Sequence, residues 1–191
     1  MTDRDERPAR AKRADAKRNE TVLLEAAAAV FVESGVDAPV REIAARAQVG
    51  MGTIYRHFPT RADLIVAVYR HQVDACAEAG PRLLTERISP HAALSRWVEL
   101  FVDFLVTKHG LAAALGSDQA GFASLHAYFI DRLVPVCEQI LDAAIAAGEI
   151  RKDVGGYELL RGIGNLCIFA DDDADYDAHR LAGLLVAGLR T

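Results

Sequence analysis

The chain has little of several features that define common protein classes. Only 7% of its 191 residues are aromatic, and its three cysteines (Cys76, Cys137, Cys167) are an odd number, far apart in apolar stretches. This argues against a disulfide scaffold or zinc module and favours buried thiols in a reducing compartment. The longest strictly apolar run, residues 26–32, is too short to span a bilayer, and the polar N-terminus has no apolar signal region. We therefore expect a cytoplasmic protein with no membrane partner.

Motifs for catalysis, metals and cofactors are also missing. None of the six histidines lies three or four residues from another histidine or a cysteine, so no helical zinc pair is present. Aspartates alternate over residues 171–177 as at the start of a calcium loop, but Tyr176 and Ala182 occupy its glycine and glutamate positions. Gly162 and Gly164 fit close helix packing better than nucleotide binding. We expect no catalytic residue, no metal and no cofactor.

Charge is unevenly distributed along the chain. The net charge is −5, yet residues 1–71 carry 12 Lys/Arg against 10 Asp/Glu, whereas residues 72–191 carry 10 against 17. The basic excess is concentrated near the N-terminus, in Arg10, Lys12, Arg13, Lys17 and Arg18. Because residues 1–17 contain almost nothing that could be buried, we predict a basic disordered arm there. It indicates a polyanion partner or, as an alternative, a solubilising tail.

Beyond the arm, apolar residues recur at helical spacing. Gly35 ends a first helix, a second begins near Pro39, a third runs from Met51 to Pro59, and Thr60 caps a fourth. Five further helical segments follow: one from Ser89–Pro90, then 110–121, 122–147, 156–170 and 177–189. No stretch alternates as a strand does. The predicted class is all-α, with about nine helices.

Residues 40–58, VREIAARAQVGMGTIYRHF, carry the most information. Two short helices joined by a three-residue turn form a helix-turn-helix, which presents its second helix to the DNA major groove. Its expected core consists of Ile43, Ala44, Ala47, Val49, Ile54 and Phe58. The residues left for the groove include no acid, which phosphate would repel: Met51, Gly52, Thr53, Tyr55, Arg56 and His57.

Three segments share their spacing with a known family: Leu24-x-Ala26-Ala27-x₃-Phe31-x₃-Gly35, then Arg41-Glu42-Ile43-Ala44, then residues 49–61, VGMGTIYRHFPTR. Together they resemble the N-terminal domain of TetR-type transcriptional repressors, in a version similar to an actinobacterial subgroup with mostly unassigned ligands. The resemblance implies a DNA-binding helix-turn-helix domain over residues 18–64. It also implies an effector-binding and dimerisation domain over residues 65–191.

The resemblance further implies which residues contact DNA: Arg41, Met51, Gly52, Thr53, Tyr55, His57 and Arg61. Arg41 would reach a base edge or a phosphate, and the start of the second helix would enter the groove. Tyr55 and His57 would bind phosphate oxygens. Arg61 would touch the DNA backbone. Two alternatives stay open, since Arg56 could be merely solvated and His57 could be a core histidine.

Three residues depart from the family pattern. Gln48 stands where glycine is usual, so a turn that needs a positive φ would be strained by roughly 1 kcal/mol. Gly50 and Pro39 stand where hydroxyl residues often cap the two helices, which removes possible phosphate contacts. We expect a binding domain that depends more on the basic arm.

The C-terminal part offers candidates for an effector site and a dimer interface. Aromatic and histidine side chains could line an effector pocket, or could be ordinary core: Trp97, Phe101, Phe104, His109, His126 and Phe129. The last two helices, at about 156–190, are the natural homodimer interface; the alternative is that they complete a monomer core.

The prediction is therefore a nucleoid-associated homodimer that binds an inverted repeat in double-stranded DNA and regulates transcription. It is expected to repress until an unknown small-molecule effector releases it. The alternative is an all-α interaction module or enzyme that keeps the helix-turn-helix as a scaffold.

Overall fold

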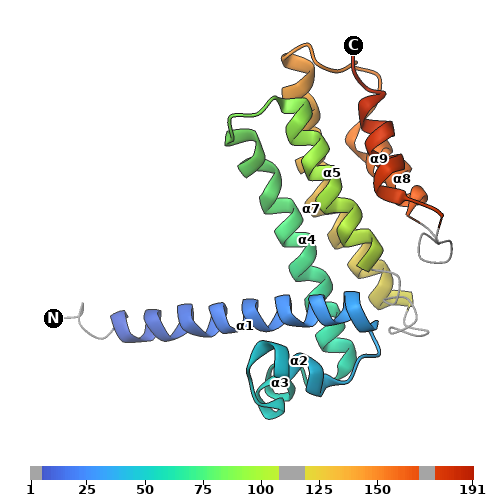
Figure 1. The fold of residues 1–191 in the computed structure, drawn as a ribbon. Helices are drawn as coiled ribbons and strands as arrows, with labels where there is room; N and C mark the ends of the chain where they lie inside the picture. The colour runs from blue at the N-terminus through green and yellow to red at the C-terminus, as the bar shows by residue number, and fades with distance from the viewer. Residues whose placement is uncertain (1–5, 108–118, 168–174) are drawn as a thin grey trace. The chain divides into compact units, whose positions relative to one another are not determined.

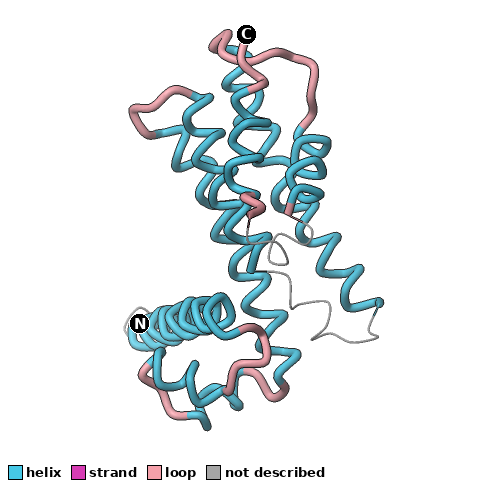
Figure 2. Tube along the Cα trace, turned by 45° about the vertical axis from the view of Figure 1, so that its right-hand side comes forward, coloured by secondary structure: helices cyan, strands magenta, loops and turns pink. Residues whose placement is uncertain are grey.

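The computed structural model describes residues 6–107, 119–167 and 175–191, and this part of the chain is built from helices (Figures 1 and 2). They are α1 (Glu6–Ser34), α2 (Val40–Ala47), α3 (Met51–His57), α4 (Arg61–Thr85), α5 (Pro90–Thr107), α7 (Gln119–Ala146), α8 (Gly156–Leu166) and α9 (Ala178–Ala187). The predicted all-α class is confirmed. Most of the short piece expected at 110–121, together with His109 and most of the acidic loop at 171–177, lies outside the described residues.

Helix α1 begins earlier than the sequence pattern suggests. Residues 6–17, predicted as part of a disordered arm, are helical. The physical reason is local, because this segment is rich in alanine, arginine and lysine, which have high helix propensities. The helix ends as predicted at Gly35, whose φ of 77° fits the left-handed cap and whose N–H donates to the Phe31 carbonyl over 3.0 Å.

The chain forms two compact units, Met1–His71 and Gln72–Thr191. Their division falls within α4, later than the boundary predicted after residue 64. Leu64, Ile65 and Val68, in the first turns of α4, are buried. Thr60 caps this helix as predicted, since the Asp63 N–H donates to its hydroxyl oxygen over 3.1 Å.

In the C-terminal unit, α5 packs against α7 and α9, and α7 packs against α8 (Figure 1). The end of α4 comes close to α7 where Gly80 faces Val136. A Cβ added at Gly80 would lie 2.2 Å from Cγ1 of Val136, so α4 and α7 can approach this closely only with glycine there. The largest fully buried side chains of this unit are Trp97, Phe101, Leu94, Leu133, Ile140, Leu141, Ile163 and Val73. These side chains form the core that stabilises the unit.

The chain end is attached to the segment that follows α7. Ile150 and Arg190 form an antiparallel bridge, and the Arg151 N–H donates to the Leu189 carbonyl over 2.9 Å. His91, at the start of α5, is the buried polar residue of the described core. One of its ring nitrogens lies 3.2 Å from Nη2 of Arg190, so the first turn of α5 contributes to this anchor.

Candidate DNA-binding and effector sites

The turn of the helix-turn-helix contains a left-handed residue that is not glycine. Gln48 has φ 55° and ψ 38°, and its N–H donates to the Ala45 carbonyl over 3.3 Å. The next N–H, that of Val49, donates to the Ala44 carbonyl over 3.0 Å. Gln48 therefore has the positive φ at which we expected strain. A side chain in this left-handed region costs roughly 1 kcal/mol of stability.

Both helices of the motif begin without a side-chain cap. Pro39 and Gly50 hold the N-cap positions of α2 and α3, and neither supplies a capping hydrogen bond. The first turn of α3 is closed instead by its own backbone, since the Thr53 N–H donates to the Gly50 carbonyl over 2.9 Å. The absence of hydroxyl caps noted in the sequence is thus a feature of the folded motif as well.

One face of α3 anchors the helix and the other is open. Ile54 is 1% exposed and the following Phe58 is also buried, whereas Met51 and Tyr55 are each 51% exposed. Gly52, Arg56 and His57 are exposed too, and Thr53 is half-buried. The structure therefore brings the predicted groove residues together on one short helix and places His57 at the surface rather than in the core. Folding alone gives no reason to leave Met51 and Tyr55 in water.

The two flanking arginines differ in their surroundings. Arg41, on α2, is exposed. Arg61 is half-buried, and its guanidinium donates to the carbonyls of Val36 and Ala38, the latter over 2.7 Å. The structure thus gives Arg61 a partner other than the predicted DNA backbone, because its guanidinium donates hydrogen bonds to carbonyl groups of the loop between α1 and α2. Sequence reasoning missed this contact because the partners are 23 and 25 residues away.

The predicted effector residues that the structure describes lie together in the C-terminal unit. Trp97 and Phe101 are each 0% exposed, and their rings stack with centroids 5.9 Å apart. Phe129 stacks on Phe101, Phe104 and His126, with centroids 5.8 to 6.0 Å apart. The Trp97 indole N–H donates to the Cys76 carbonyl over 2.9 Å. This is the packing of a core, the alternative that the sequence left open, and only His126 of the cluster is exposed.

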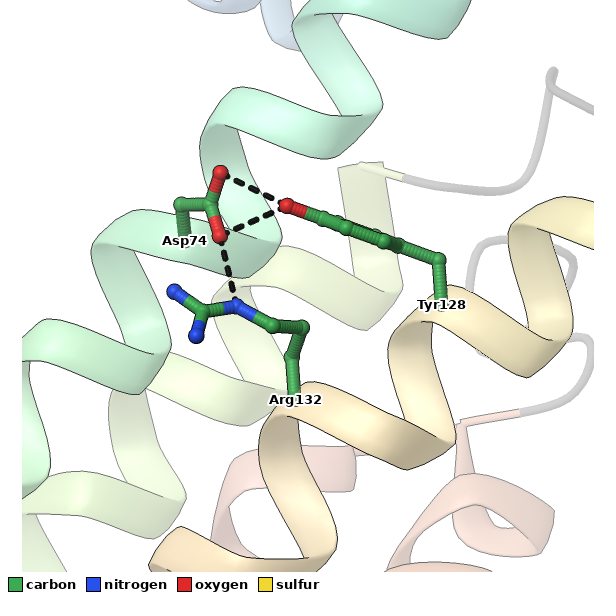
Figure 3. A network of polar contacts seen from close by, with 3 residues as sticks. All are labelled: Asp74, Tyr128 and Arg132. Carbon is green, nitrogen blue, oxygen red and sulfur yellow. Dashed lines mark hydrogen bonds and ion pairs between the residues drawn. The ribbon is translucent and has the colours of Figure 1, made fainter.

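A polar network between α4 and α7 was not found from the sequence (Figure 3). The Tyr128 hydroxyl lies 2.8 Å from both carboxylate oxygens of Asp74, and Nε of Arg132 donates to one of them over 2.8 Å. Burial and the adjacent Asp74 carboxylate raise the pKa of Tyr128. The network joins two helices whose contacting residues are 54 and 58 positions apart in the chain. The helical periodicity of the sequence therefore does not predict it.

The three cysteines are buried free thiols, as the sequence suggests. Burial raises the pKa of Cys76 and of Cys137 to about 12, and that of Cys167 to about 11. Burial thus favours the protonated thiol at neutral pH, which is the less nucleophilic form. Among the described helices, none is both long and apolar enough to cross a membrane.

A helix-turn-helix with an open second helix, followed in the chain by a second helical unit, is the arrangement of helix-turn-helix DNA-binding proteins. Residues 23–68 match the model of the bacterial regulatory proteins of the tetR family, and residues 89–191 match that of the C-terminal domain of SbtR-like transcriptional regulators. The chain belongs to the TetR family of transcriptional regulators.

Solved and curated relatives agree with this assignment. A TetR transcriptional regulator from Streptomyces coelicolor is 36% identical, with a TM-score of 0.77 over 90% of this chain and 98% of that chain. A TetR transcription regulatory protein from Mycobacterium vanbaalenii is 33% identical, with a TM-score of 0.69 over 94% and 99%. The HTH-type transcriptional activator FasR of Mycolicibacterium smegmatis is 36% identical over 84 residues, which are 44% of this chain and 38% of FasR. The match thus spans well under half of that curated relative.

Proposed function

We propose that this TetR-family protein binds an inverted repeat as a homodimer and represses transcription until a small-molecule effector releases it. The observation that carries the proposal is the open face of α3, where Met51 and Tyr55 are each half exposed beside buried Ile54. A seven-residue helix with this division between anchor and open face suits insertion into the major groove.

Each exposed residue has a role in this proposal. Met51, Gly52 and Thr53 lie at the N-terminal end of α3 and enter the groove. Tyr55 and His57 bind phosphate oxygens, and Arg41 of α2 reaches a base edge or a phosphate. Arg61 is given a supporting role instead, because its guanidinium is already bonded to the loop that leads into α2.

The homodimer is proposed to form through α8 and α9, within residues 156–190. Leu184 is 58% exposed, Leu185 is 39% exposed and Tyr157 is 44% exposed, so these two helices leave large side chains in water in a single chain. A second copy would cover this apolar surface. Two-fold symmetry would also place two recognition helices on one inverted repeat, whose half-sites are about 34–36 Å apart.

An effector is proposed to act in the C-terminal unit, at the end of the ring cluster formed by Phe104, His126 and Phe129. His109, which lies outside the described residues, is proposed as a further residue of this effector site. Trp97 and Phe101 lie deeper in the packed core and would report on the effector through Trp97 fluorescence rather than bind it first. The effector can release DNA only through different affinities for two states of the protein.

The direction of regulation needs its own test because the curated relative FasR is named an activator. If the protein represses, deleting it raises transcription of the genes beside its binding site. A fall in transcription instead makes activation, the second candidate, the correct assignment.

The deciding experiment is a pull-down of genomic fragments with the purified protein, followed by sequencing and a search for a shared inverted repeat. The Thr53→Asp variant is the matched control, since it adds one negative charge to the open helix. We expect a shared repeat with the wild type and none with the variant. Salt-sensitive binding without a shared repeat, equal in both proteins, would make the helix-turn-helix a scaffold and would refute the proposal.

A further inference from the structure

We propose that the N-terminal extension of α1, residues 6–20, is a second DNA-binding element that contacts the phosphates flanking each operator half-site. This inference rests on the proposed function, because it assigns a further contact surface for the same DNA. The partner chemistry is the sugar–phosphate backbone of a duplex, bound without regard to base sequence.

Helix propensity favours this part of α1, but burial of apolar side chains does not hold it in place. Residues 17–20 are exposed, and Leu23 is the first buried side chain of the helix among those described. The extension contains alanine but no larger aliphatic or aromatic residue, so it has no apolar face to pack on a core. A helix that is polar on all sides is stabilised by its own charge pairs or by a partner outside the fold.

The net charge of the extension means that a partner outside the fold would be an anion. Residues 6–20 contain six lysines and arginines against three acids, Glu6, Asp15 and Glu20, so their net charge is +3. At 100° per residue, positions 10, 13 and 17 share one side of α1 with the acids at positions 6 and 20 at its two ends, and position 15 falls on the other side. The clustered charge favours a polyanion, because each phosphate that is neutralised releases condensed counterions.

The extension belongs to the same compact unit as the recognition helix. Figure 1 shows α2 and α3 along the C-terminal half of α1, while its N-terminal half runs past them. Residues 6–20 of a helix span about 22 Å, which corresponds to roughly six to seven base pairs of duplex. The extension can therefore reach phosphates outside the region that α3 covers.

A second observation, independent of charge, points in the same direction. Both helices of the motif begin without a side-chain cap, so Pro39 and Gly50 supply no hydroxyl for phosphate. The backbone N–H groups of such a helix N-terminus can still bind phosphate, so only the hydroxyl contacts are missing here. Phosphate contacts from the extension would compensate for this loss.

The test compares the wild type with a triple variant, Arg10→Ala, Arg13→Ala and Lys17→Ala. Alanine keeps the helix propensity, so charge is removed without breaking α1. The matched control removes three exposed basic side chains from the C-terminal unit, by Arg82→Ala, Arg87→Ala and Lys152→Ala. Affinity is measured by fluorescence anisotropy over a range of salt concentrations.

Three duplexes serve as probes. One ends at the inverted repeat selected in the pull-down, one extends it by about eight base pairs on each side to match the reach of the helix, and one is a long mixed-sequence duplex.

We expect the triple variant to bind the extended duplex about tenfold or more weakly, with the salt slope reduced by about two to three. On the short duplex and in the control variant, we expect affinities close to wild type. Equal affinity and slope for variant and wild type on both long duplexes would overturn this inference while leaving the proposed function intact. Failure of the proposed function looks different, because the wild type would then show no preference for the repeat over the mixed-sequence duplex.

Discussion

Helices α3 and α5 differ in the exposure of their large side chains. On α3, Met51 and Tyr55 are each 51% exposed, whereas on α5 Trp97 and Phe101 are fully buried and stacked. The rings of α5 contribute to the free energy of folding through burial and contact. The exposed residues of α3 contribute little to it and remain available to a partner. Substitutions should therefore separate stability from DNA binding along the same chain.

The largest expected effect is on stability, at Phe101. Replacing Phe101 with alanine leaves a cavity beside Trp97 and Phe129, and should lower the free energy of unfolding by about 3–5 kcal/mol. Denaturant unfolding followed by circular dichroism measures this change. A loss below about 1 kcal/mol would mean that the ring cluster is loosely packed, and would favour a binding cavity there.

The next effect concerns DNA binding without a change in stability. Tyr55→Asp places a negative charge on the open face of α3, and should weaken operator binding about 100-fold because phosphate repels it. The melting temperature should stay the same. Gln139→Asp adds the same charge on an exposed position of α7 and should leave DNA affinity unchanged. If Tyr55→Asp unfolds the protein, the contrast between the two helices is wrong.

A smaller loss of stability is expected at the network between α4 and α7. Tyr128→Phe removes the hydroxyl that contacts Asp74, and should lower the free energy of unfolding by about 1 kcal/mol. Glu86→Gln is the control, since the Glu86 carboxylate accepts from Arg96 over 2.8 Å on an exposed surface outside the proposed dimer interface. Chemical denaturation measures the free energy of unfolding of both variants. Equal losses would show that the network adds nothing beyond a surface contact.

The smallest effect is a gain of stability, in the turn of the helix-turn-helix. Gln48→Gly relieves the left-handed conformation at φ 55° and should raise the free energy of unfolding by about 0.5–1 kcal/mol. Gln48→Ala keeps the strain and should bring no gain. Thermal melts of both variants test this prediction. A gain in stability with alanine would show that the gain does not come from relief of backbone strain.

The motif could be predicted from the sequence because its signals are local. The bounds of α2 and α3, the caps at Gly35 and Thr60, and the burial of Ile54 follow from periodicity and from residues a few positions apart. The contact surface on α3 follows by subtraction, as the residues left over once the core is assigned.

The N-terminal segment shows where local reasoning was incomplete. Its lack of apolar residues predicts a disordered arm over residues 1–17, and Lys17 is exposed, yet the structure is helical from Glu6. Helix propensity acts without burial, so alanine, arginine and lysine extend α1 beyond its core-facing part.

By itself, the sequence determined the all-helical class, the helix-turn-helix and the separation of charge between the two units, because each is set by spacing or composition. Only the tertiary structure decided which candidate side chains are core, that Arg61 holds the loop before α2, and that Asp74 joins Tyr128 and Arg132. These outcomes depend on contacts between residues far apart in the chain, 25 positions for Arg61 and Val36 and 58 for Asp74 and Arg132. Periodicity within one helix says which side faces inward, but it does not say which partner will be met there.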